Sequence, residues 1–249
     1  EATDVRVTHG PLLGRPGPDT MSLWVRTEKP GEVKVFYGTE KGHLDQQASL
    51  VTTDLAKDRT GIITLDKLNS NTRYYYRIAD HQLDGSFRTL PKAADFRNPE
   101  GNPKGLFNFK FEFACGNNQN GNGNSAGPTV PVFDTLNAKV RDEVHFAILN
   151  GDWLYEQRRD YPPESWLHQV GLDSMEEAPR VVRKAPSIVG VWENYKVFLE
   201  RGKNLSQWHR HVPSFYTADD HELLNDIYGA GEIGYVNRRA VFRDIGTQA

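Results

Sequence analysis

Residues 144–156 read VHFAILNGDWLYE, and this stretch decides which fold the chain can adopt. Its first half is almost continuously apolar, which is typical of a strand buried on both faces of a sheet. The apolar run stops at Gly151 and Asp152, where the sequence turns polar. Because ligands of open α/β sheets bind at the carboxyl ends of strands, we expect functional side chains in the following loop, with Tyr155 and Glu156 among them.

A second predicted strand lies upstream of this one. Residues 107–113 place Phe at every second position and lead to Cys115. A loop rich in Gly and Asn follows over 116–128, and residues 132–140 then carry apolar side chains at helical spacing. Strand, loop and helix in this order indicate the beginning of an α/β domain.

A third polar cluster lies downstream. Residues 191–199 have the pattern of a helix, and residues 211–217 lead into the tetrapeptide DDHE at 219–222. Each of the three loops offers groups that bind metals, namely a thiolate, carboxylates, a phenolate or an imidazole. Each cluster alone has an ordinary explanation, such as a helix cap for the two Asp residues or a small buried thiol for Cys115. Three such clusters in succession favour a metal site.

The first ninety residues have a different pattern. Short β-segments separated by turns are predicted at 5–9, 21–26, 33–38, 61–65, 72–79 and 85–89. This spacing is typical of a β-sandwich. The run 68–74 resembles a tyrosine corner, in which the hydroxyl of Tyr74 bonds to upstream backbone. Lys, Asp, Asn, Gly and Pro without periodicity then predict a linker over 92–105.

The composition excludes several functional classes. A formal net charge of -3 and a pI near 6.3 give no cationic field for nucleic acids or anionic membranes. No stretch approaches the roughly 20 apolar residues of a membrane span. With one cysteine the chain forms no internal disulfide. The chain opens at Glu1 without an initiator Met or an apolar signal core, which fits a processed exported protein or a trimmed polypeptide.

Together these motifs resemble the alkaline phosphatase D (PhoD-like) metallophosphatase family. Residues 146–156 resemble the Gly-Asp-x-x-Tyr block of metallophosphoesterases, and residues 219–222 resemble the Asp-Asp-His-Glu block of the PhoD-like family. The front of the chain resembles the family's N-terminal sandwich, through His9 with Gly10, residues 23–26 and residues 87–89.

The resemblance implies a division into two domains. Residues 1–91 would form a fibronectin type III-like all-β sandwich, and residues 92–105 would be the linker. Residues 106–249 would form the N-terminal part of an α/β metallophosphoesterase domain of the four-layer type, incomplete in this chain.

The resemblance also implies a set of site residues. The metal ligands would be Cys115, Asp152, Tyr155 and Asp220, with Asp152 bridging two ions and Tyr155 binding iron as a phenolate. His221 would face the substrate and act in catalysis with Asp152. Residues that support the ligands or contact the substrate would be Asp219, Glu222 and Asn117. The implied cofactors are Fe3+ and Ca2+, with other divalent cations left open.

The implied activity is metal-dependent hydrolysis of phosphate monoesters or diesters by a dinuclear site with a metal-activated hydroxide. Two alternatives stay open: a noncatalytic extracellular binding protein on a decayed phosphatase scaffold, and a phospholipase-type phosphodiesterase. Family members continue past the point that matches Ala249 and carry further ligands there. We therefore expect this 249-residue piece alone to be inactive, and the remaining C-terminal part of the same protein to complete the site. The resemblance also implies a secreted, periplasmic or cell-surface location.

Overall fold

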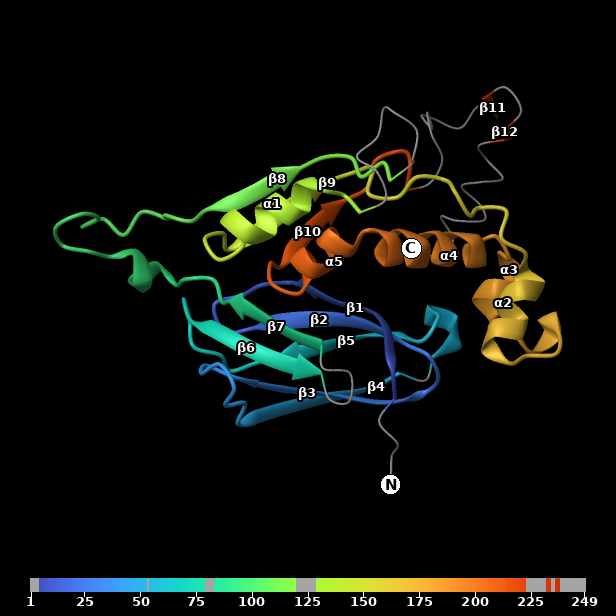
Figure 1. Ribbon diagram of the computed structural model, residues 1–249, viewed down its shortest axis with the longest axis horizontal. Coiled ribbons are helices and arrows are strands. Elements are labelled where there is room, and N and C mark those ends of the chain that lie inside the picture. The colour runs from blue at the N-terminus through green and yellow to red at the C-terminus, as the bar shows by residue number, and fades with distance from the viewer. Residues whose placement is uncertain are drawn as a thin grey trace.

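Two antiparallel sheets form the N-terminal part of the protein (Figure 1). The computed structural model describes residues 5–52, 54–78, 83–119 and 129–222, together with two short paired strands, β11 (Glu232–Ile233) and β12 (Val236–Asn237). The first sheet has the order β1-β2-β5 and consists of β1 (Val7–Gly14), β2 (Met21–Thr27) and β5 (Thr60–Leu65). The second has the order β4-β3-β6-β7 and consists of β3 (Gly31–Gly38), β4 (Gln46–Thr52), β6 (Arg73–Ile78) and β7 (Leu83–Arg88).

The core of this sandwich comes from alternating side chains. Leu23 and Val25 of β2 and Ile78 of β6 are each 0% exposed, and they belong to one continuous apolar cluster that both sheets contribute to. The side chains between them point to the outer faces, as the two-residue period of a strand requires. The predicted sandwich is therefore confirmed in its inward-facing positions.

The tyrosine corner is present as predicted. The hydroxyl of Tyr74 accepts a hydrogen bond of 2.9 Å from the backbone N–H of Asn69. The Tyr74 ring stacks on Phe87 with a centroid distance of 5.5 Å. This corner fixes the turn before β6 and is a structural feature of the sandwich core.

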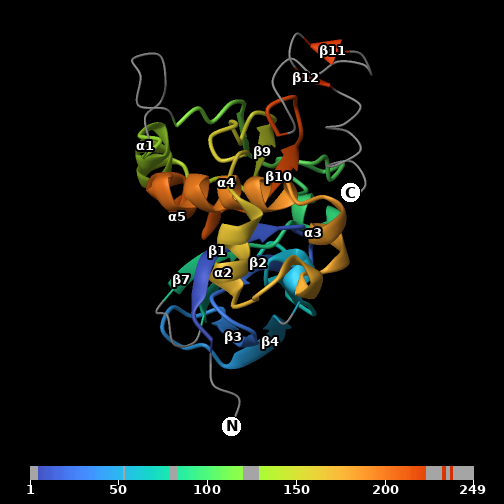
Figure 2. The same cartoon turned by 90° about the vertical axis from the view of Figure 1, so that its right-hand side faces the viewer.

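The second part of the chain holds a small parallel sheet and most of the helices (Figure 2). The sheet has the order β10-β9-β8, with β8 (Phe111–Ala114), β9 (Phe146–Asn150) and β10 (Ser214–Thr217). The α-helices are α1 (Val132–Lys139), α2 (Pro163–Val170), α3 (Arg180–Lys184), α4 (Ile188–Arg201) and α5 (Lys203–His209). Short 3-10 helices are η1 (Leu55–Lys57), η2 (Ala93–Phe96) and η3 (Met175–Glu177).

The two faces of the parallel sheet have different surroundings. Ala147 and Leu149 of β9 are 0% exposed and share an apolar cluster with Phe133 of α1 and Trp208 of α5. Aromatic side chains cover the opposite face, and we call them the aromatic face: Phe109, Phe111, Phe113, Phe146 and Phe215. Phe113, with 60% of its surface exposed, shows how open this face is among the described residues.

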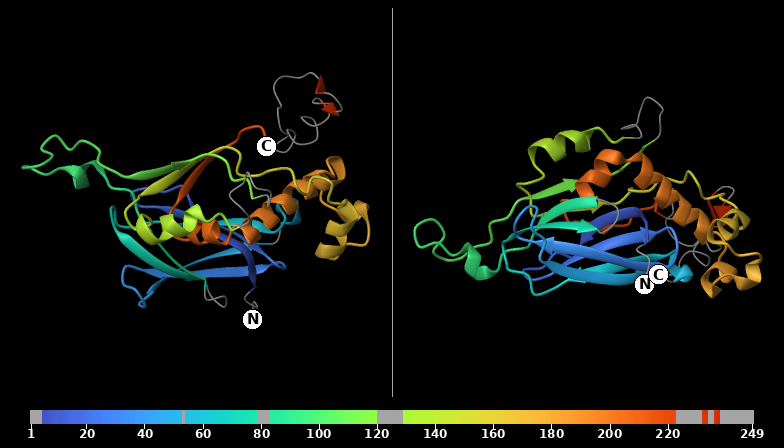
Figure 3. Two further views of the ribbon diagram at one scale, coloured as in Figure 1. Left: turned by 45° about the horizontal axis from the view of Figure 1, so that its top comes forward. Right: turned by 60° about the horizontal axis from the view of Figure 1, so that its bottom comes forward.

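Helices α2 and α4 are attached to the sandwich by a buried charge cluster, and Figure 3 shows α4 running alongside the first sheet. The Asp58 carboxylate accepts bonds from Arg26 Nε at 2.8 Å and from Trp166 Nε1 at 3.0 Å, and Lys196 Nζ lies 3.6 Å away. Burial by itself would raise the pKa of Asp58, but the Arg26 bond and the Lys196 charge outweigh it and hold the pKa below its ordinary value. Sandwich and helices are thus joined by polar as well as apolar contacts.

The strands differ from the sequence predictions in three places. Strand β1 begins at Val7 and runs to Gly14, beyond the predicted 5–9. Strand β4 was not predicted, and β8 begins at Phe111 although the alternation begins at residue 107. The helices predicted over 132–140 and 191–199 are confirmed as α1 and α4. The domain boundaries at 91 and 105 stay predictions.

None of the helices in the described ranges combines the length and apolar character needed to cross a membrane.

Candidate metal centre

The three predicted loops meet at one edge of the parallel sheet. Strands β8, β9 and β10 run in the same direction, so the residues after Ala114, Asn150 and Thr217 emerge side by side. The loop after β8 bonds to the loop after β9 through Gly116 N–H to the Gly151 carbonyl at 3.1 Å. The edge of the sheet therefore gathers polar loops that lie far apart in the sequence.

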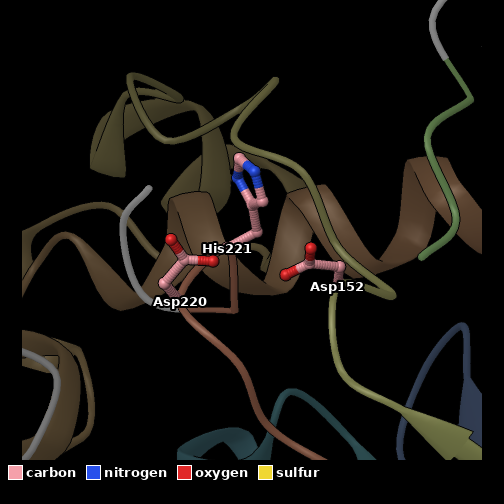
Figure 4. Close-up of side chains that lie close together, drawn as sticks. All are labelled: Asp152, Asp220 and His221. Atoms are coloured by element: carbon pink, nitrogen blue, oxygen red, sulfur yellow. The ribbon is translucent and has the colours of Figure 1, made fainter. Parts of the chain in front are cut away.

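Three side chains with ligand atoms come together there. One ligand atom each from Asp152, Asp220 and His221 lies within 4.8 Å of the others, and all three residues are partly buried. Figure 4 shows that Asp152 comes from one loop and that Asp220 and His221 come from another. This spacing is short enough for one cation to contact all three groups.

The turn that presents Asp152 has an unusual backbone. Gly151 has φ of 74° and Asp152 has φ of 56°, both in the left-handed region. A Cβ at Gly151 would lie 2.5 Å from the Cβ of Asp219, so glycine is needed for the two loops to approach. Asp tolerates this conformation better than most residues, and such strain is concentrated at functional sites.

Glu222 connects the two loops. Its carboxylate accepts hydrogen bonds from the backbone N–H groups of Trp153 at 2.6 Å, Asp219 at 2.7 Å and Asp152 at 3.2 Å. The side chain of Glu222 therefore sets the relative position of the loops that carry Asp152 and Asp220.

His221 is oriented by its neighbours. Its Nδ1 lies 2.8 Å from Oε2 of Glu156, and its ring lies beside the Tyr155 ring with a centroid distance of 4.1 Å. Burial disfavours the imidazolium form, but the Glu156 hydrogen bond and the charges of Glu156, Asp152 and Asp220 outweigh it and raise the pKa of His221. The bond to Glu156 leaves Nε2 for another partner.

Crowded acids disfavour further negative charge at the site. Burial raises the pKa of Asp152, and Asp220, Asp219 and Glu222 raise it further, while His221 opposes them. Burial likewise raises the pKa of Tyr155, with a contribution from Asp152. The acidic side chains around Asp152 therefore favour the neutral forms of Asp152 and Tyr155, and a bound cation would reverse this effect.

The loop after β8 lies against the site. Cys115 is exposed, and it is outside the group of three ligands. Asn117 is buried, and its backbone N–H donates to the Asp152 carbonyl at 2.7 Å. The hydroxyl of Tyr155 lies 3.8 Å from the position that a Cβ on Gly116 would take. The Tyr155 hydroxyl therefore lies near the loop that contains Cys115.

Among the predicted site residues, the structure brings Asp152, Asp220 and His221 within ligand distance of one another. His221, predicted as a substrate-facing residue, lies in this ligand group. Asp219 accepts a hydrogen bond from the backbone N–H of Asp220 at 3.0 Å. The individual roles of all predicted site residues stay predictions.

Two contributors were not predicted. Arg159 donates from Nη2 to the carbonyls of His221 and Glu222, each at 3.0 Å. Asn194 of α4 bonds to the loop that begins at Tyr155. Both contacts join segments far apart in sequence, and neither residue belongs to a motif that could have revealed it.

Comparisons with known proteins bear on the fold. A family model described as a domain of unknown function (DUF7800) matches residues 4–99. A search of curated proteins found no match. Among solved structures, the chain is similar to PhoD, with a TM-score of 0.65 and 18% identity over 98% of this chain and 44% of that chain.

The chain is also similar to the purple acid phosphatase PPD1 from seeds of yellow lupin (Lupinus luteus). The TM-score is 0.51 and the identity 14%, over 96% of this chain and 39% of that chain. The chain thus spans less than half the length of each protein. At these identities the likeness shows the fold alone: the chain has the fold of the matched part of two phosphatase-type structures, including the N-terminal β domain.

Proposed function

We propose that this chain is part of a metal-dependent phosphoester hydrolase of the alkaline phosphatase D type. The observation that carries the proposal is the meeting of Asp152, Asp220 and His221 within 4.8 Å at the carboxyl edge of the parallel sheet. Its support is the fold shared with PhoD and a purple acid phosphatase. In this proposal residues 1–91 are the sandwich, residues 92–105 the linker and residues 106–249 part of the metallophosphoesterase domain.

The residues present fit a cation. Oδ1 of Asp152 is buried and accepts no hydrogen bond from any described residue. A buried acceptor of this kind needs a donor or a positive charge. Carboxylates, imidazole and a nearby phenol suit iron beside a harder cation that prefers oxygen ligands, so Fe3+ and Ca2+ stay the proposed pair. Asp152, Asp220 and His221, with Tyr155 and Cys115, would hold them.

A bound cation would polarise a phosphoryl oxygen and lower the pKa of a bound water. The chain's own residues have distinct tasks. Glu222 accepts hydrogen bonds from three backbone N–H groups and so fixes the position of the Asp152 loop relative to the Asp220 loop. Glu156 fixes one nitrogen of His221, so the other can bind a ligand or give a proton to a leaving oxygen.

The three ligand side chains Asp152, Asp220 and His221 are too few to hold two metal ions that each keep coordination positions open for water and phosphate. We propose that polypeptide outside the described residues supplies further ligands, as the resemblance implies. Export from the cytoplasm and the choice between monoesters and diesters belong to the same proposal.

The test is metal analysis and hydrolysis with the full-length protein. We expect bound metal by elemental mass spectrometry and hydrolysis of p-nitrophenyl phosphate or of bis-p-nitrophenyl phosphate, with chelation abolishing both. Asp152→Asn should lower kcat/KM by about 100-fold or more, because even residues that only orient metal ligands contribute 10–100-fold.

The matched control is Asp134→Asn, the same change at an exposed position on α1. It should leave metal content and activity unchanged. A full-length protein that binds no metal and hydrolyses neither ester would contradict the proposal. That result would favour the alternative of a noncatalytic binding protein on a phosphatase-type fold.

A further inference from the structure

Asn194 is a buried amide in the middle of helix α4. Its side chain is 0% exposed, and among the described residues its hydrogen bonds go to the loop that follows Asp152. Oδ1 accepts from the backbone N–H groups of Gln157 at 2.8 Å and Arg158 at 2.6 Å. Nδ2 donates to the carbonyl of Tyr155 at 2.6 Å. One side chain thus holds three backbone groups within four consecutive residues.

These contacts act on the residues next to the site. The held segment begins with Tyr155 and includes Glu156, whose carboxylate lies 2.8 Å from Nδ1 of His221. The next residue along the chain, Arg159, donates to the carbonyls of His221 and Glu222. A shift of this segment relative to α4 would therefore move the partners of His221 as well as the Tyr155 ring.

The loop has little regular structure to hold it. Residues 151–162 form no helix or strand, so their backbone groups lack the regular hydrogen bonds of such elements, and Asn194 supplies partners for three of them. Removing a buried amide that bonds to three such groups should lower the stability of the loop, because each backbone group left unpaired pays the free energy of its desolvation. Asn194 is well suited to fix one conformation of this loop on a rigid helix.

We propose that Asn194 is a positioning residue that holds Tyr155 and the Glu156–His221 pair in the geometry for metal binding. The inference rests on the proposed function, because it assigns Asn194 to the same metal centre. Asn194 acts through the loop backbone and touches neither metal nor substrate.

The experiment compares Asn194→Ala with Asn137→Ala in the full-length protein. Asn137 of α1 is also a buried helical asparagine, and its Nδ2 donates to the Asn204 carbonyl at 2.8 Å, away from the metal centre. Fe3+ alone is the probe. Its affinity is measured by titration, and the visible charge-transfer absorption of an Fe3+–phenolate pair reports on Tyr155. Thermal unfolding of the metal-free protein reports on stability.

We expect Asn194→Ala to weaken Fe3+ binding by about 10–100-fold and to shift or remove the phenolate absorption. Asn137→Ala should lower stability but leave affinity and absorption as in the wild type. If Asn194→Ala does not fold, Asn194→Asp replaces it. That variant keeps an acceptor for the two N–H groups and loses the donor to the Tyr155 carbonyl. We therefore expect a smaller loss of Fe3+ affinity and a smaller shift of the phenolate absorption.

Failure of this inference is distinguishable from failure of the proposed function. A wild-type protein that gives neither Fe3+ binding nor the phenolate absorption refutes the metal centre itself. A wild-type protein that gives both, with a folded Asn194 variant indistinguishable from it, overturns only the role of Asn194. Equal losses in the Asn194 and Asn137 variants also overturn it, since they would reflect general destabilisation.

Discussion

The sandwich and the parallel sheet bury their apolar side chains in different ways. In the sandwich, two sheets cover each other, and residues such as Leu23 and Ile78 are 0% exposed. In the parallel sheet, the described helices cover the side of Ala147 and Leu149, and the aromatic face is exposed within the part of the chain that the structure describes. The site lies at the carboxyl edge of the parallel sheet, and its loops are held by hydrogen bonds of Glu222, Arg159 and Asn194. Apolar packing thus stabilises the sandwich, whereas polar contacts shape the site.

The largest effect is expected in the sandwich core. Leu23→Ala removes a fully buried side chain between the two sheets, and it should lower the free energy of unfolding by about 3–5 kcal/mol. Urea denaturation measures the change. The matched control is Ile62→Ala on the outer face of neighbouring strand β5, where the side chain is 42% exposed and the cost should stay below about 1 kcal/mol. Equal costs at the two positions would show that the sandwich core is not closed.

An intermediate effect is expected at the covered side of the parallel sheet. His209 of α5 is 2% exposed, and burial lowers its pKa to about 3. In the unfolded chain the imidazole of His209 becomes protonated below about pH 6.5, whereas in the folded protein it stays neutral down to about pH 3. The free energy of unfolding is therefore highest above about pH 6.5 and falls as the pH decreases toward 3. At pH 5 the loss should be about 2 kcal/mol.

His209→Gln removes this titration. The difference in the free energy of unfolding between pH 7 and pH 5 should shrink by about 2 kcal/mol, measured by urea denaturation at both pH values. His168→Gln, an exposed histidine on α2, serves as the control and should leave the difference unchanged. A pH profile of His209→Gln that matched the wild type would mean that His209 is not held neutral by burial.

The smallest effect on stability is expected on the aromatic face. Phe113→Ser changes a side chain that is 60% exposed, so the free energy of unfolding should change by less than about 0.5 kcal/mol. Light scattering should show less self-association, because large exposed apolar patches promote it. Leu149→Ala on the covered face should instead cost about 2–5 kcal/mol. A large loss of stability with Phe113→Ser would mean that this face is packed.

Much of the fold could be predicted from the sequence because its strands follow strong patterns. The alternation in 21–26 predicts β2, and the apolar run in 144–150 predicts β9. Strand β4 escaped prediction because it lies at the edge of its sheet, where Gln46, Gln47 and Val51 are exposed and leave a weak apolar pattern. Edge strands have little need for the alternation that sequence reading depends on.

The site was only partly predictable. Asp152, Asp220 and His221 stand in recognisable motifs, so their meeting at one edge of the sheet could be expected. Arg159 and Asn194 could not be identified in this way. Asn194 sits 39 residues from Tyr155, and a polar residue within an amphipathic helix ordinarily indicates its solvent face. Contacts of this kind depend on how helix and loop pack, which local sequence does not encode.

Each of the two site loops supplies a side chain that bonds to the backbone of the other loop, and this arrangement has an evolutionary consequence. Glu222 binds backbone N–H groups of the first loop, and Arg159 of the first loop binds carbonyls of the second. Substitutions at these two positions should therefore be epistatic, with a double variant losing less than the sum of the single losses, since either one already frees the loops. Across descendants of a common ancestor, Arg159 and Glu222 should then be kept or replaced as a pair.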